Sequence, residues 1–147
     1  MKAFKINDDR YLMEDINIIL INQEYWFGGT LYYFITVFEK NGSFSYFKTR
    51  SFESAKNTIK LLFEFLKSHG AKNLACLDNE FIINMDNLKS LDHLTNLAGS
   101  NKIEAIFKNG NSFALYQGTN RNYANFLLKS YNIQEEQYSH LPNYKKD

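Results

Sequence analysis

The sequence has little of what marks several classes of protein. Of its 147 residues, one is cysteine (Cys76) and one is proline (Pro142). A single cysteine cannot form an internal disulfide, which fits a reducing compartment. No proline-rich or glycine- and serine-rich stretch divides the chain, so we predict a single domain over residues 1–147.

The chain also lacks a charge excess. Lysine and arginine total 17 and aspartate and glutamate total 16, which gives a net charge of +1. Proteins that bind nucleic acid through its phosphates usually carry a strong basic excess. The balance therefore argues against a nucleic-acid partner.

Long apolar runs are missing as well. The longest aliphatic run is Ile18 to Ile21, whereas a membrane-spanning helix needs about 20 apolar residues. The first residues turn acidic at Asp8 and Asp9 and do not resemble a signal peptide. We therefore expect a soluble, cytoplasmic protein with no membrane partner.

What the chain does contain is apolar and aromatic. Hydrophobic residues make up 44% of the sequence and aromatic residues 16%. Disordered chains lack that much surface to bury, and a chain of this length can form a sizeable core. The abundance of Asn, Lys, Ile, Phe and Tyr is typical of AT-rich bacterial or phage genomes.

Residue patterns in the first half predict three strands and a helix. The strands are expected over residues 15–22, 30–39 and 43–49. Because both faces of the second are apolar or aromatic, we expect it to be central and covered on both sides. Asn41-Gly42 predicts a hairpin with a type I′ turn. The helix is expected to begin after Ser51 and to end at Gly70.

The second half predicts a similar series. A strand is expected over residues 80–85, and a hairpin over 102–108 and 111–117 about Asn109-Gly110. Thr119 or Asn120 would cap a final helix. Between these, Asp86 would begin a short helix ended by Gly99, with one apolar face made of Leu88, Leu91, Leu94 and Leu97. Residues 132–147 are polar and predict a loosely ordered tail.

The two halves are evenly spaced, since Asn41 and Asn109 are 68 residues apart and so are Ser51 and Thr119. One interpretation is a duplication with a site at the junction. The other, favoured by poor residue identity, is chance recurrence of a common ββα unit. Either way we predict an α+β fold: a mostly antiparallel sheet with helices packed on one face and two hairpin–helix units.

Motifs of catalysis are scarce. No glycine-rich nucleotide loop, zinc-site spacing or calcium loop occurs. His93-Leu94-Thr95 resembles half of a two-histidine phosphoesterase site, but the second half is missing. Cys76 lies in an apolar run and is expected to act as a buried hydrophobe. We therefore predict no catalytic residue, no metal and no cofactor.

Two groups of residues remain as candidates for binding. Tyr25-Trp26-Phe27 precedes Gly28-Gly29, and tryptophan and tyrosine are enriched in binding hot spots. The alternative is a bulge or turn that tucks Trp26 into the core. A stripe of Tyr32, Phe34 and Tyr46 is a further candidate if one sheet face is uncovered. The second group, Asp78 and Glu80, would project on one side of an extended segment, although solvated surface acids are the better explanation.

These observations predict a small non-catalytic protein-binding module, of the inhibitor or immunity type, that neutralises one protein partner. Two alternatives stay open. One is a small-molecule binder or enzyme with an aromatic pocket between sheet and helices, in which His93 or the two acids would transfer protons. The other is a subunit of a larger assembly that uses an exposed strand edge or aromatic face. The expected contacts are Tyr25, Trp26 and Phe27, with Asp78 and Glu80 as secondary contacts.

Overall fold

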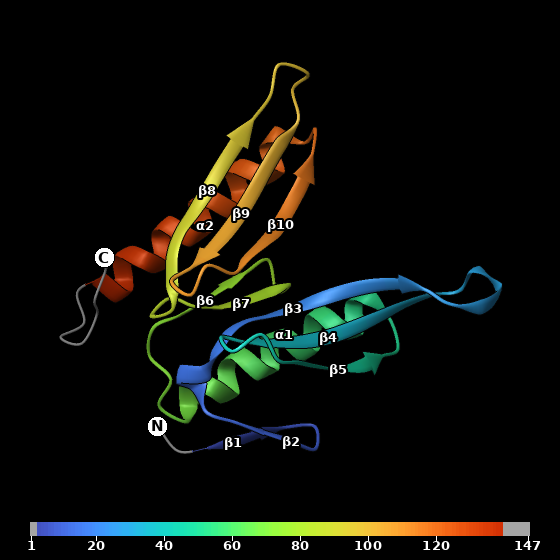
Figure 1. The fold of residues 1–147 in the computed structure, drawn as a ribbon, viewed down its shortest axis with the longest axis vertical. Coiled ribbons are helices and arrows are strands. Elements are labelled where there is room, and N and C mark those ends of the chain that lie inside the picture. Colours follow the sequence, from blue (N-terminus) through green and yellow to red (C-terminus); the bar gives the residue numbers. More distant parts are fainter. Residues whose placement is uncertain (1–2, 140–147) are drawn as a thin grey trace.

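The computed structural model describes residues 3–139 (Figure 1). In chain order the elements of this part of the chain are β1 (Phe4–Ile6), β2 (Asp9–Tyr11), a 3-10 helix η1 (Met13–Asp15), β3 (Ile16–Tyr25), a 3-10 helix η2 (Phe27–Gly29), β4 (Leu31–Glu39), β5 (Phe44–Thr49), α1 (Phe52–Ser68), β6 (Leu74–Leu77), β7 (Phe81–Asn84), β8 (Leu88–Thr95), β9 (Asn101–Phe107), β10 (Ser112–Gly118) and α2 (Arg121–Ser139). Antiparallel strands and two helices confirm the predicted α+β class.

The larger sheet has five strands in the order β5-β4-β3-β7-β6, all antiparallel. Helix α1 covers one face, where Ile19 and Ile35 of the sheet share a core with Ile59 and Leu66 of the helix. The Ser51 side chain caps α1 by accepting from the Ser54 amide at 3.0 Å, as predicted. β3 is the central strand, whereas β4 lies between β3 and β5.

The smaller sheet has three strands in the order β10-β9-β8, and α2 packs against it (Figure 1). Its core is continuous with the second face of the larger sheet, because Ile18 and Leu20 of β3 share a cluster with Ile103 of β9 and Leu127 of α2. The sequence predicted one sheet, whereas the described chain has three: a two-stranded sheet of β1 and β2, and the two larger sheets, each with its own helix. The two larger sheets share one apolar core.

Both Asn-Gly hairpins are present, but their turns are not of type I′. Gly42 and Gly110 have positive φ (92° and 94°), whereas neither asparagine does. In each loop the glycine amide donates three residues back, to Glu39 in one and Phe107 in the other. This is a type I turn closed by a left-handed glycine, the usual three-residue hairpin loop.

The two halves match over more elements than the sequence indicated. Each has a short hairpin (β1–β2 or β6–β7), then three antiparallel strands, then a helix. The predicted ββα units, β4–β5–α1 and β9–β10–α2, are the last parts of these longer series.

The helix predicted after Asp86 is wrong, because residues 88–95 form strand β8. A spacing of three between leucines fits a helix, but β8 pairs with β9 along its length, and this ladder overrides the local pattern. Leu97 is fully exposed at the tip of the β8–β9 hairpin. Gly99 serves that turn, with φ 80°, and caps no helix.

The predicted tail also needs correction, since α2 continues to Ser139 and therefore includes residues 132–139. The polar composition misled because Gln134 has a specific structural role: its amide is hydrogen-bonded to the backbone of Cys76 in β6. Residues 140–147 of the predicted tail lie outside the described part of the chain.

Candidate functional site

The β3–β4 hairpin forms an arm that projects beyond the rest of the five-stranded sheet (Figure 1). Its loop closes where the Trp26 amide donates to the Thr30 carbonyl and the Gly29 amide donates to the Trp26 carbonyl, both at 3.0 Å. Gly28 and Gly29 have φ of 78° and 76°. Residues that carry a side chain rarely adopt this backbone conformation, so the two glycines allow the chain to reverse here.

The three aromatic residues at the tip of the arm differ in environment. Phe27 is fully exposed and Tyr25 is 75% exposed, whereas Trp26 is 46% exposed. The Trp26 ring lies 4.9 Å from the Tyr32 ring and 5.3 Å from the Phe34 ring, measured between centroids. Trp26 is therefore neither in the core nor detached: one side packs on the sheet and the other faces solvent.

The predicted stripe is present on the sheet face opposite α1. Phe34 and Tyr46 meet edge to face at 5.5 Å, and the Lys48 ammonium lies 4.0 Å above the centre of the Tyr32 ring. Phe34 itself is buried beneath its neighbours. We define the aromatic surface as Trp26, Tyr32, Phe34, Tyr46 and the adjacent Phe44.

Polar groups at the margin of the aromatic surface are few and mixed in sign. The Trp26 indole nitrogen donates to Glu24 at 3.1 Å, and Lys48 supplies the cation that contacts Tyr32. Phe44 and Tyr46 are each 60% exposed. Exposed aromatic side chains with a polar margin suit contact with a protein. The same surface offers little positive charge for the phosphates of a nucleic acid.

Asp78 and Glu80 come together, and both are partly buried. Both belong to the turn between β6 and β7, where Asp78 and Asn79 have positive φ. The Tyr123 hydroxyl of α2 lies 2.7 Å from Asp78 Oδ2 and 2.7 Å from Glu80 Oε2. Lys56 of α1 forms an ion pair with Asp78 at 3.3 Å. The turn is thus held between the two helices.

The electrostatics of this cluster favour a neutral carboxyl. One hydroxyl proton cannot serve two carboxylates at once. Burial raises the pKa of Glu80, and the neighbouring Asp78 raises it further against the opposing effects of Tyr123 and Lys56. Burial and both carboxylates also raise the pKa of the Tyr123 hydroxyl, which stays protonated. Whether the two acids also contact a partner stays a prediction.

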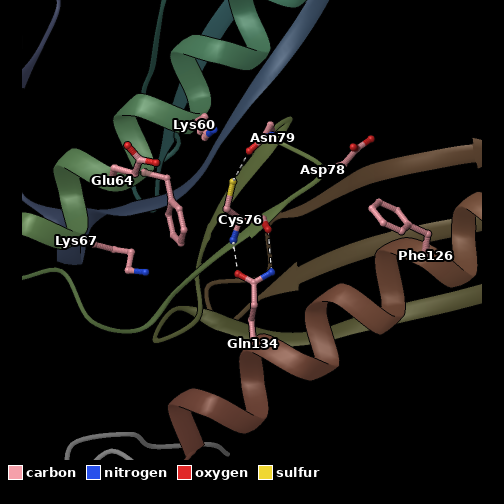
Figure 2. Close-up of a pocket in the computed structure, with 9 residues that line it drawn as sticks. Lys60, Glu64, Lys67, Cys76, Asp78, Asn79, Phe126 and Gln134 are labelled. Carbon is pink, nitrogen blue, oxygen red and sulfur yellow. Dashed lines mark hydrogen bonds between the residues drawn. The ribbon is translucent and has the colours of Figure 1, made fainter.

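A groove of about 650 Å³ runs between α1 and α2 along the edge of β6 (Figure 2). Figure 2 shows Cys76 at its centre, with Lys60, Glu64 and Lys67 on α1 and Phe126 and Gln134 on α2. Burial raises the pKa of the Cys76 thiol to about 11. A thiol with that pKa is almost entirely protonated at neutral pH and is a poor nucleophile.

The two histidines in the described part of the chain, His69 and His93, do not line this groove. His93 of β8 is 2.9 Å from the Asn101 side chain of β9 and does not line the groove, so a proton-transfer role beside Asp78 has no geometric support. His69 ends α1, where its ring lies 2.9 Å from the Phe65 carbonyl. Within residues 3–139, no group of three or more His, Cys, Asp or Glu side chains could hold a metal ion.

Sequence reasoning missed Lys56, Tyr123 and Gln134. Tyr123 has the spacing of an apolar helix face with Leu127, and nothing local indicates that its hydroxyl meets two acids 43 and 45 residues away. Of the helices described, none is long and apolar enough to cross a membrane. In comparisons with known proteins, no family model, no curated protein and no solved structure matches this chain.

Proposed function

We propose that this protein is a small non-catalytic protein-binding module, of the inhibitor or immunity type, that neutralises a partner protein. The observation that supports this proposal is the exposure of Tyr25, Trp26 and Phe27 on the projecting β3–β4 arm. Exposed aromatic side chains are costly to keep in water, and clusters of them are typical of protein interfaces.

The arm and the aromatic surface together have the layout of a binding site. Trp26 is held in place by two rings and by Glu24, so it loses little conformational freedom on binding. Tyr25 and Phe27 beside it are open to contact a partner. Near-neutral charge suits recognition by packing and hydrogen bonding, with electrostatics left to steer the encounter.

The experiment compares variants at the tips of two hairpins. Phe27→Ser removes an aromatic group that contributes nothing to the core, and Leu97→Ser is its matched control, because Leu97 is also fully exposed, on the β8–β9 hairpin. Tagged wild type and both variants are used to capture proteins from lysate of the source cell. We expect one dominant protein with wild type and Leu97→Ser and its loss with Phe27→Ser.

A second experiment adds the purified module to the captured protein and measures the activity of that protein. We expect the activity of that protein to fall in proportion to the wild-type module added and to be retained with Phe27→Ser. Equal capture by all three proteins, or no effect on the partner's activity, would contradict the proposal.

A second candidate function rests on the groove between the helices. Its walls combine Phe63 and Phe126 with Lys60, Lys67 and Asp78, which is the mixture of apolar and polar groups that small-molecule sites use. A screen of metabolites by thermal shift, with Lys60→Ala and Lys67→Ala as variants, would identify such a ligand. A ligand whose stabilisation disappears in these variants would favour this candidate over the first.

A further inference from the structure

The two edge strands of the five-stranded sheet differ in whether their outer backbone groups have partners. At one edge the side chain of Gln134 pairs with the backbone of β6. At the other edge, no strand of the described chain pairs with the outer side of β5, and the β1–β2 hairpin contacts β5 only through side chains, where Tyr11 meets Ser45 (Figure 1). β5 contains no proline, no glycine and a single charge, Lys48. A strand of this kind is a template for further pairing.

The backbone groups that point away from the sheet can be identified from the register. The Glu39 amide donates to the Ser43 carbonyl at 2.9 Å, so this pair is a hydrogen-bonded one. Hydrogen-bonded pairs alternate along an antiparallel ladder, and Phe38↔Phe44, Thr36↔Tyr46 and Phe34↔Lys48 are thus non-bonded pairs. The N–H and C=O groups of Phe44, Tyr46 and Lys48 therefore point outward.

From this edge we infer that β5 pairs with β5 of a second copy of the chain, antiparallel and centred on Tyr46. The outward N–H and C=O groups of one strand must pair with the outward groups of the other. Phe44, Tyr46 and Lys48 of one copy therefore lie opposite residues of the same set in the second copy. When the two strands are centred on Tyr46, Phe44 of each copy lies opposite Lys48 of the other. All three outward residues of each strand then form backbone hydrogen bonds. The pairing would form about six backbone hydrogen bonds between the copies.

Side chains favour this register over the one centred on Lys48. Centring on Lys48 would bring two lysines face to face, and like charges directly opposite are destabilising. Centring on Tyr46 instead sets each Lys48 beside a Phe44 ring, which is 60% exposed and able to accept a cation. The two Tyr46 rings, equally exposed, then lie next to each other on the same sheet face.

The sheet face that carries α1 has a groove beside β5, where a second copy of the chain would lie. The groove has a volume of about 330 Å³, and its lining includes Phe47 of β5, Leu61 and Phe65 of α1, and Lys5, Ile6 and Asn7 of the β1–β2 hairpin. Leu61 is among the most exposed large apolar residues of the helix. Because a two-fold axis perpendicular to the sheet keeps both copies of α1 on the same face, the mixed apolar and polar border of this groove lies on the same side of the sheet in both copies.

The proposal is tested by sedimentation velocity of the full chain between about 1 and 500 µM, and we expect a concentration-dependent dimer. Phe44→Lys places a lysine opposite Lys48 twice per dimer, and we expect at least a tenfold weaker association. Adding Lys48→Glu to Phe44→Lys restores opposite charges in this register alone, and we expect association to return. Circular dichroism and thermal unfolding verify that each variant is folded.

Three results would overturn the inference: a monomer throughout the range, a dimer that Phe44→Lys leaves unchanged, or a double variant that stays monomeric. Phe27→Ser on the arm serves as a control and should dimerise like wild type. Failure of the dimer is thus distinguishable from failure of the proposed partner binding, because Phe44→Lys tests the β5 edge and Phe27→Ser tests the arm.

Discussion

The side-chain amide of Gln134 pairs with the backbone of Cys76 as a neighbouring strand would. Its Oε1 accepts from the Cys76 amide and its Nε2 donates to the Cys76 carbonyl, both at 2.8 Å (Figure 2). One side chain from α2 therefore satisfies both outward groups of a residue in the edge strand β6. The contact joins residues 58 apart and fixes the last turns of α2 to the larger sheet.

Gln134→Ala is expected to lower the free energy of unfolding by about 1–3 kcal/mol, because it leaves two partly buried backbone groups without partners. Gln137→Ala is the matched control, since Gln137 lies on the same helix and is exposed. Urea unfolding of both variants measures the difference. Equal stability of the two variants would mean that the amide pairing contributes nothing.

Glu80→Gln is expected to remove a pH dependence of stability. Burial raises the pKa of Glu80 in the folded protein, so folding favours its protonated form. That contribution is fully present below the unfolded pKa, near 4.3, and is lost as the pH rises through the raised folded value. Glutamine resembles the protonated carboxyl and keeps its contribution at every pH.

The measurement is urea unfolding from about pH 4 to pH 8, a range that begins near the unfolded pKa and extends upward, in the direction of the shift. Relative to Glu80→Gln, wild type should lose stability as the pH rises. Glu64→Gln, at an exposed carboxylate of α1, is the control and should follow wild type. Parallel curves for wild type and Glu80→Gln would refute the raised pKa.

The Cys76 thiol is expected to react slowly with Ellman's reagent. Burial raises the pKa of this thiol from 9.0 to about 11, which lowers the thiolate fraction about 100-fold at pH 8. The folded protein should therefore be modified at least about 100-fold more slowly than the chain unfolded in guanidinium. Modification of the folded protein at the rate of the unfolded chain would contradict the raised pKa.

Asn17→Val is expected to stabilise the protein by about 1 kcal/mol. Asn17 is buried at a bulge in β3, and neither polar atom of its side chain has a hydrogen-bond partner among the described residues. Valine avoids the desolvation of two unpaired atoms and favours strands. A melting temperature below that of wild type would indicate that the amide has a partner in solution.

Much of the first half of the fold could be predicted because its signals are local. Ser51 caps α1 through a bond to a residue three positions away, and Gly70 ends the helix with φ 95°. Glycine conformation and apolar periodicity act within a few residues, so the sequence displays them directly. The stripe of Tyr32, Phe34 and Tyr46 followed from strand alternation, together with the condition that one face is uncovered.

The wrong predictions concern segments whose structure depends on residues that are distant in the sequence. Leu88 to Leu97 has helical spacing, yet pairing with β9 makes the segment a strand. Residues 132–139 look like a polar tail, yet Gln134 binds β6. In each case the local preference is weak, within about 1 kcal/mol per residue, and a ladder or a pair of hydrogen bonds outweighs it.

The sequence by itself determined the α+β class, the hairpins at Asn41-Gly42 and Asn109-Gly110, helix α1 and the presence of an aromatic cluster after β3. Only the tertiary structure decided that Trp26 packs on Tyr32 and Phe34 while Phe27 stands in solvent. It also decided that Asp78 and Glu80 meet Tyr123 and that two sheets share one core. Backbone conformation and periodicity are local properties, whereas burial and the pairing of polar groups depend on which distant segments come into contact.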